Sequence, residues 1–163
     1  MSGEFDPAGH RLVEVRAFEE LAVGERFPLP SRTLTAAHFS AFQALSGDNH
    51  PIHYDREYAR AQGHDGLLAH GLQVLSLSAA GAGLFPHVIG PALIGFLDVE
   101  ARFVAPAREG DTLYPVLEIS ELTRQRTTGV VTMAATIHNQ RGVLVLEGRQ
   151  RYLLRLGDPA DQR

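Results

Sequence analysis

Hydrophobic and polar residues alternate along much of the second half of the chain. Between residues 93 and 104, Leu97 and Phe103 fall on one face of an extended chain, and Asp98 and Glu100 fall on the other. This period of two is typical of a β-strand with one buried face. Further stretches with strand character are 113–122, 127–139 and 143–156, with 13–16 and part of 27–34 as one or two shorter candidates. The pattern predicts a largely antiparallel sheet.

The segment that follows Thr35 has helical spacing instead. Thr35 is a suitable N-cap, and Phe39, Phe42 and Leu45 recur at intervals of three, which places them on one face of a helix. Gly47 can adopt the left-handed conformation that ends many helices. We therefore expect a helix that ends at about Leu45.

A second helix is predicted from Gly71 to about Leu84. Its residues are apolar around most of the circumference: Leu72, Val74, Leu75, Leu77, Ala79, Ala80 and Ala82. A helix of this kind is buried on nearly every side. The two halves together predict an α+β fold in which an antiparallel sheet wraps around one long buried helix.

The chain reads as a single domain with short tails. Residues 1–12 and 157–163 are polar and lack a period, so we expect flexible tails on either side of a domain at 13–156. No apolar run reaches the roughly 18 residues that a membrane helix needs. The first residues also lack the basic and apolar pattern of a signal peptide. The expected location is cytoplasmic, without membrane attachment.

Composition removes several classes of chemistry. The chain has no cysteine, which excludes disulfides, thiolate nucleophiles and cysteine-bound metal clusters. Its formal charge of −4 gives no sign of a nucleic-acid-binding face. All 15 basic residues are arginine, so a lysine Schiff base is excluded. Arginines suit phosphate groups, and candidate contacts are Arg102, Arg108, Arg124, Arg126, Arg149 and Arg151, of which the sequence singles out none.

The residues that could carry chemistry gather between positions 48 and 70. Asp48 and His53 stand five residues apart across a turn, since Pro51 prevents a continuous helix there. A carboxylate and an imidazole placed in this way can share one water molecule. The carboxylate accepts its proton, and the imidazole orients the water or delivers a proton elsewhere.

The start of the predicted second helix supplies a second element of a site. The first N–H groups of a helix lack partners and lie at the positive end of its dipole. Gly71 lets a carbonyl oxygen approach them without a side chain in the way. Such a helix start can stabilise a thioester enolate, so the pattern favours hydration of a double bond conjugated to a carbonyl. His70, just before it, is expected to hold the loop through its ring nitrogens.

Other interpretations of these residues stay open. Asp48 and His53 can be simple turn residues, because aspartate and proline are common in turns. The histidines, with Asp48, are also good ligand types for zinc or iron. However, their spacing matches no established metal motif, and we expect no metal and no bound cofactor. The short run Gly81 to Gly83 does not fit a dinucleotide loop.

Residues 46–55, SGDNHPIHYD, resemble the Gly-Asp-x-Asn-Pro-x-His-x-Asp signature of MaoC-like dehydratases, which include the hotdog-fold (R)-specific enoyl-CoA hydratases. Residues 57–59, 68–72 and 18–25 are also similar to this family, so the resemblance covers roughly 15–155. It implies that Asp48 and His53 are catalytic and that the amide of Gly71 binds the thioester carbonyl. It further implies a homodimer with paired sheets and acyl-CoA along the interface.

One departure concerns the residue before the proline. The family usually has asparagine there, whereas this chain has His50, a larger and titratable residue that can also donate hydrogen bonds. We expect this change to affect substrate choice and pH profile. His50 and His70 therefore join Gly71 as expected substrate-binding residues.

The resulting hypothesis is a lyase that reversibly hydrates a trans-2-enoyl thioester to the (R)-3-hydroxyacyl thioester, carried on CoA or on acyl carrier protein. Two alternatives remain. A hotdog thioesterase would direct the same water at the carbonyl, although the order of Asp48, Pro51 and His53 resembles the hydratase arrangement. A non-catalytic acyl-binding subunit of a heteromeric dehydratase would use the fold alone.

Overall fold

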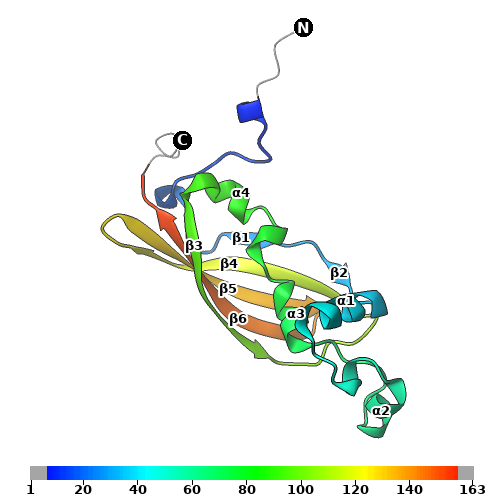
Figure 1. Ribbon diagram of the computed structural model, residues 1–163. Coiled ribbons are helices and arrows are strands. Elements are labelled where there is room, and N and C mark those ends of the chain that lie inside the picture. Colours follow the sequence, from blue (N-terminus) through cyan, green and yellow to red (C-terminus); the bar gives the residue numbers. More distant parts are fainter. Residues whose placement is uncertain (1–6, 158–163) are drawn as a thin grey trace.

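The computed structural model describes residues 7–157 (Figure 1). Within the two predicted tails, positions 1–6 and 158–163 therefore lie outside the described residues. The described part of the first tail contains one turn of 3-10 helix, Pro7–Gly9. No helix in the described part of the chain combines the length and the apolar character needed to cross a membrane.

An antiparallel sheet forms the body of the molecule. Its four long strands are β3 (Leu93–Phe103), β4 (Thr112–Arg124), β5 (Thr128–Asn139) and β6 (Leu144–Arg155). They match the predicted strands to within about two residues at each end, the usual uncertainty of a strand boundary. The predicted stretch 27–34 contributes two short strands, β1 (Arg26–Pro28) and β2 (Arg32–Thr33), whereas 13–16 forms none.

The strand order places β3 at one edge of the sheet. The order is β1-β4-β5-β6-β3, and β2 also pairs with β4. Every pair is antiparallel, as the alternating sequence predicted. On the polar face of β3, Asp98, Glu100 and Arg102 lie opposite Arg151, Arg149 and Glu147 of β6, and each pair forms a salt bridge.

The helices cover one face and one end of the sheet (Figure 1). The first is α1 (Ala36–Ser46), which begins after Thr35 and ends at Gly47 in the left-handed conformation, as predicted. Phe39 is buried and Phe42 is half-buried. Leu45, in the last turn of the helix, is 83% exposed. On this helix the apolar core reaches Phe39 and does not extend to the last turn.

The helix predicted from Gly71 to Leu84 is interrupted. It consists of α3 (Gly71–Ser76), a 3-10 turn at Ala80–Ala82 and a new helix, α4 (Phe85–Ile89). Ser76 Oγ donates to the carbonyl of Gln73 at 2.6 Å, and Ser78 Oγ donates to that of Leu75 at 2.8 Å. Hydroxyls that bond to nearby carbonyls compete with the helical ladder. The expectation of one long buried helix is therefore wrong, although the α+β class is confirmed.

The break also changes which side chains are buried. Val74 lies in the core, but Leu72 is 65% exposed and Leu84 is exposed as well. Two apolar clusters result. The first packs α4 against the middle of the sheet and includes Phe27, Phe85, Leu117 and Tyr152. The second joins α1 and α3 to the other end of the sheet.

Candidate active site

The loop after α1 is shaped by its own side chains. Asp48 Oδ1 accepts the N–H of His50 at 3.1 Å, and His50 Nδ1 accepts the N–H of Ile52 at 3.3 Å. Pro51 begins the single 3-10 turn Pro51–His53. His50 therefore acts as a local cap, and its exposed ring lies 6.2 Å from that of His53. Its predicted contact with substrate stays a prediction.

His53 is oriented by a backbone carbonyl. Its Nδ1 lies 2.7 Å from the carbonyl oxygen of Leu68. A carbonyl only accepts hydrogen bonds, so Nδ1 carries a proton and the neutral ring has its lone pair on Nε2. Burial lowers the pKa of His53, and the bond to Leu68 opposes that shift only in part. Near neutral pH the imidazole is therefore an acceptor at Nε2.

The buried side chain of His70 packs against this loop. Its ring is 2% exposed and stacks on that of His53 with 3.8 Å between the ring centroids. His70 Nε2 lies 2.6 Å from the hydroxyl of Tyr54, which in turn donates to the carbonyl of Asp48 at 3.0 Å. His70 Nδ1 lies 3.4 Å from Gln73 Oε1. A polar chain thus ties α3 to the backbone of Asp48.

Three of the predicted site residues converge. Asp48, His53 and His70 each offer one side-chain oxygen or nitrogen atom, and these atoms all lie within 4.8 Å of one another. The residue types also suit a metal ion. However, both nitrogens of His70 already have partners, as does Nδ1 of His53. Oδ2 of Asp48 and Nε2 of His53 have no partner among the described residues. Two free acceptors suit a water molecule between them better than a metal.

Gly71 opens α3 directly after this cluster. No side chain caps the helix, and among the described residues no acceptor faces the N–H of Gly71. A Cβ at this position would lie 3.1 Å from the ring of Phe103, so a side chain here would have to displace that ring. The N–H of Gly71 therefore has no hydrogen-bond partner among the described residues. That it binds the thioester carbonyl stays a prediction.

An apolar cavity lies on the other side of α3. It has a volume of about 580 Å³ and extends between α3, α4 and the strands β3 and β6. Leu72, Leu75 and Ser76 line it from α3. Phe96 and Tyr152 line it from the sheet. One short helix therefore borders both the polar cluster and the cavity.

Sequence reasoning missed the groups that hold the cluster in place. Tyr54 stands inside the motif but was given no role, and its hydroxyl bridges His70 and Asp48. Gln73 is the one amide in an otherwise apolar run, a signal that could have identified it. The role of the Leu68 carbonyl cannot be found from the sequence, because every residue has the same backbone carbonyl group.

Comparison with known proteins identifies the family of the chain. A family model described as a MaoC like domain matches residues 19–140. The (R)-specific enoyl-CoA hydratase of Aeromonas caviae is 28% identical over 134 residues, which cover 80% of this chain and 92% of that protein. A longer relative, the protein MaoC of Klebsiella aerogenes, is 34% identical over 97 residues. The match covers 59% of this chain but only 28% of the length of that protein.

Solved structures support the fold. The monoamine oxidase regulatory protein of Archaeoglobus fulgidus superposes with a TM-score of 0.82 at 29% identity, covering 91% of this chain and all of that one. A Mycobacterium tuberculosis protein with a double hotdog fold superposes with a TM-score of 0.73 at 24% identity, covering 89% and 46%. The predicted hotdog fold is confirmed. Because the family model spans most of the sequence, the chain belongs to the MaoC-like domain family.

Proposed function

We propose that this protein reversibly adds water to a trans-2-enoyl thioester to give a 3-hydroxyacyl thioester. The observation that carries the proposal is the pairing of Asp48 with a His53 whose Nδ1 is fixed by the carbonyl of Leu68. Two acceptors then face one water molecule. The carboxylate of Asp48 and Nε2 of His53 each accept one hydrogen bond from this water, which leaves a lone pair of its oxygen free to attack carbon.

The reaction follows from these positions. The water oxygen bonds to C3 of the substrate while Asp48 takes one of its protons and His53 Nε2 holds the other by a hydrogen bond. The electrons of the double bond move toward the carbonyl oxygen, where the N–H of Gly71 stabilises the enolate. The proton taken from water is then returned to C2. The net change is the addition of H and OH across the double bond, and no cofactor is consumed.

The cavity suits the acyl part of such a substrate. Its lining is almost entirely hydrocarbon, and α3 leads from Gly71 to Leu72 and Leu75 at its wall. A thioester with its carbonyl at Gly71 can thus place an apolar chain in about 580 Å³ of space. Acyl groups are preferred over polar ones because burying an unpaired polar group costs free energy.

We further propose a homodimer formed through β3. The outer edge of this strand has no partner among the described residues. It carries exposed apolar side chains along its length, including Ile94, Phe96, Leu97 and Val99. A long, exposed and apolar edge strand favours aggregation unless another strand pairs with it. A second copy provides such a strand.

Two finer points rest on relatives. The Aeromonas caviae protein is named as (R)-specific and as acting on enoyl-CoA, and we extend both properties to this chain. Acyl carrier protein remains an alternative carrier. The cytoplasmic location expected from the sequence is retained as a prediction.

The test uses the purified chain with a short and a medium trans-2-enoyl-CoA. Loss of the conjugated absorbance and release of free thiol are followed separately. Loss of absorbance without thiol release is the expected result. Asp48→Asn and His53→Ala should each lower kcat by about 10²- to 10⁴-fold, the usual contribution of a general acid or base. Asp65→Asn and His87→Ala, which alter exposed residues outside the cluster, serve as matched controls.

Each rival has a distinct outcome. Thiol release that depends on Asp48 indicates a thioesterase. Activity that is lost on chelation and restored by zinc indicates a metal site at Asp48, His53 and His70. A folded sample that turns over no thioester of any chain length contradicts the catalytic proposal and favours a non-catalytic subunit.

A further inference from the structure

The loop between β3 and β4 adjoins the segment that orients His53. Arg108 pairs with Leu68 in an isolated antiparallel bridge. Two backbone hydrogen bonds flank that bridge: Ala69 N–H to Ala107 O at 2.9 Å, and Glu109 N–H to Leu67 O at 3.1 Å. The carbonyl of Leu68 is the one that holds His53. Arg108 therefore lies one strand spacing from the backbone that positions the imidazole.

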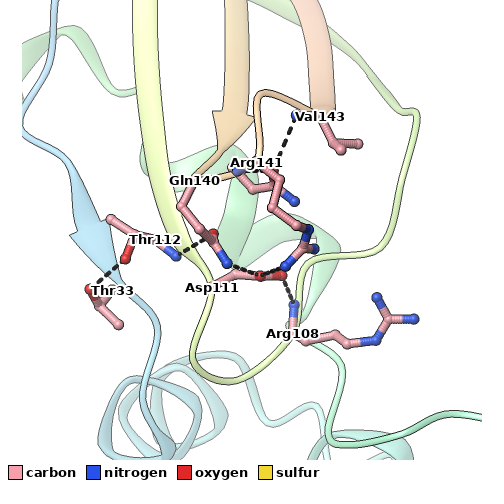
Figure 2. Close-up of polar contacts among 8 residues, drawn as sticks. Thr33, Arg108, Asp111, Thr112, Gln140, Arg141 and Val143 are labelled. Atoms are coloured by element: carbon pink, nitrogen blue, oxygen red, sulfur yellow. Dashed lines mark hydrogen bonds and ion pairs between the residues drawn. The ribbon is translucent and has the colours of Figure 1, made fainter.

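A buried carboxylate fixes this loop without occupying the Arg108 side chain. Asp111 is buried, and its Oδ2 accepts the backbone N–H of Arg108 at 2.9 Å. Its Oδ1 accepts from Gln140 Nε2 at 2.9 Å and from Arg141 Nη1 at 3.4 Å. Figure 2 shows the side chain of Arg141 pointing toward Asp111, whereas that of Arg108 points away from it.

In the part of the chain that the structure describes, the guanidinium of Arg108 has no partner. Its Nε is buried and has no hydrogen-bond acceptor. The residue as a whole is half-buried, and no ion pair or side-chain hydrogen bond involves it among the described residues. A buried donor without an acceptor is rare and costly in native proteins. The two terminal nitrogens of Arg108 also have no partner in the described chain and are not buried, so they can bind two oxygens of an oxyanion in the bidentate geometry that arginine favours.

The other arginines suggested by the sequence are excluded by their contacts or their position. Arg102, Arg124, Arg149 and Arg151 form salt bridges with Glu147, Glu19, Glu100 and Asp98. The Nε of Arg149 is also buried without an acceptor, but its Nη2 is held by Glu100. Arg126 lies in the turn that joins β4 to β5, whereas Arg108 lies before the start of β4. The 13 residues of β4 separate the two, a distance of roughly 40 Å at about 3.3 Å per residue. Figure 1 shows this hairpin at the end of the sheet away from α1 and from α2 (Arg56–Ala61).

We infer that Arg108, which does not line the apolar cavity, binds a phosphate of the thioester carrier. This inference rests on the proposed function. The phosphate next to the pantetheine arm is common to CoA and to acyl carrier protein, so one arginine serves either carrier. The acyl chain lies in the cavity beside α3, and the carrier extends past the segment that contains Leu68.

The experiment compares carriers that differ in this phosphate. Wild type and Arg108→Gln are assayed with the same enoyl group on CoA, on 4′-phosphopantetheine and on pantetheine. For Arg108→Gln we expect KM to rise about tenfold or more for the two phosphate-bearing thioesters, the size of one charge-assisted hydrogen bond. The kcat should be unchanged, as should both constants for the pantetheine thioester. A fourth substrate, enoyl-acyl carrier protein, distinguishes the natural carrier.

Controls separate this contact from general electrostatics. Arg32→Gln and Arg126→Gln remove the same charge from exposed positions that have no salt-bridge partner in the described chain, and neither should change KM. An equal rise in KM for all three variants, or a loss with pantetheine as large as with CoA, overturns the assignment of Arg108. Absence of turnover by wild type with every thioester instead contradicts the proposed function, so the two failures are distinguishable.

Discussion

The hydrogen bond between His53 Nδ1 and the carbonyl of Leu68 fixes what the imidazole can do. With its proton held on Nδ1, the neutral ring cannot donate from Nε2 until it has first accepted a proton there. This favours Asp48 as the group that takes a proton from water. It also makes the protonation of His53 inhibitory, since an imidazolium would no longer accept from the water.

The lowered pKa of His53 predicts the acid side of the pH profile. Burial is the main cause, and the neighbouring His70 lowers the pKa further. Because the neutral form is the active one, kcat/KM for an enoyl-CoA should be maintained as pH falls to the ordinary value of 6.5 and decline only below it. The measurement is a pH–rate profile with NMR titration of the ring protons. A decline with its midpoint at or above 6.5 that follows His53 would contradict the prediction.

The same shift affects stability, and its sign can be worked out. The unfolded chain binds a proton at His53 near pH 6.5, whereas the folded chain binds it only at lower pH. As pH falls through this interval, the unfolded state holds more protons, so the free energy of unfolding decreases. His53→Ala should remove this part of the acid sensitivity.

Single residues show where sequence reasoning succeeds and where it stops. Asp48 and His53 were identified because their types and spacing are visible in the chain. Arg108 could be suggested but not distinguished from Arg102 or Arg149, since salt-bridge partners come from other strands. Tyr54 was missed because its role depends on a contact with His70, sixteen positions away.

At the scale of elements, strands were easier to predict than helices. Alternation of apolar and polar residues located all four long strands, although in β3 no residue is buried and the apolar side chains are exposed in the described chain. The break after α3 depends on two serine hydroxyls that turn back onto helical carbonyls. Serine is compatible with either outcome, so composition alone favoured a continuous helix.

The pairing of β3 with β6 provides a test at this scale. Gly148 of β6 lies opposite Ala101, and a Cβ at Gly148 would stand 2.2 Å from the carbonyl oxygen of Glu100. That neighbour is backbone and cannot rotate away, so Gly148→Ala should lower the free energy of unfolding by about 1–3 kcal/mol. Gly95→Ala in β3 is the matched control, because nothing lies within 4 Å of its Cβ position. Urea denaturation measures the free energy of unfolding of both variants. Equal values for the two would refute the predicted clash.

At the scale of the whole molecule, the unpaired edge of β3 predicts the oligomeric state. Leu97 is 46% exposed on this strand, whereas Val23 is 63% exposed outside it. Leu97→Lys places a charge in the proposed dimer interface and should shift the protein to monomer in light scattering, because an unpaired buried charge is costly. Val23→Lys should remain dimeric. A monomeric wild type, or two variants that behave alike, would exclude β3 as the interface.

The break in the helix between α3 and α4 has a consequence for how the accepted acyl-chain length can change. Gln150 of β6 donates to both the carbonyl and the hydroxyl of Ser78, at 3.0 and 2.8 Å, so the gap is held open from the sheet. An unbroken helix would run about 1.5 Å per residue straight across this region. On the proposed function, the room for an acyl tail is thus set by where the main chain stops being helical. If α3 ended one residue earlier or later, the range of accepted acyl-chain lengths would change abruptly. Replacing a side chain that lines the cavity would change this range gradually.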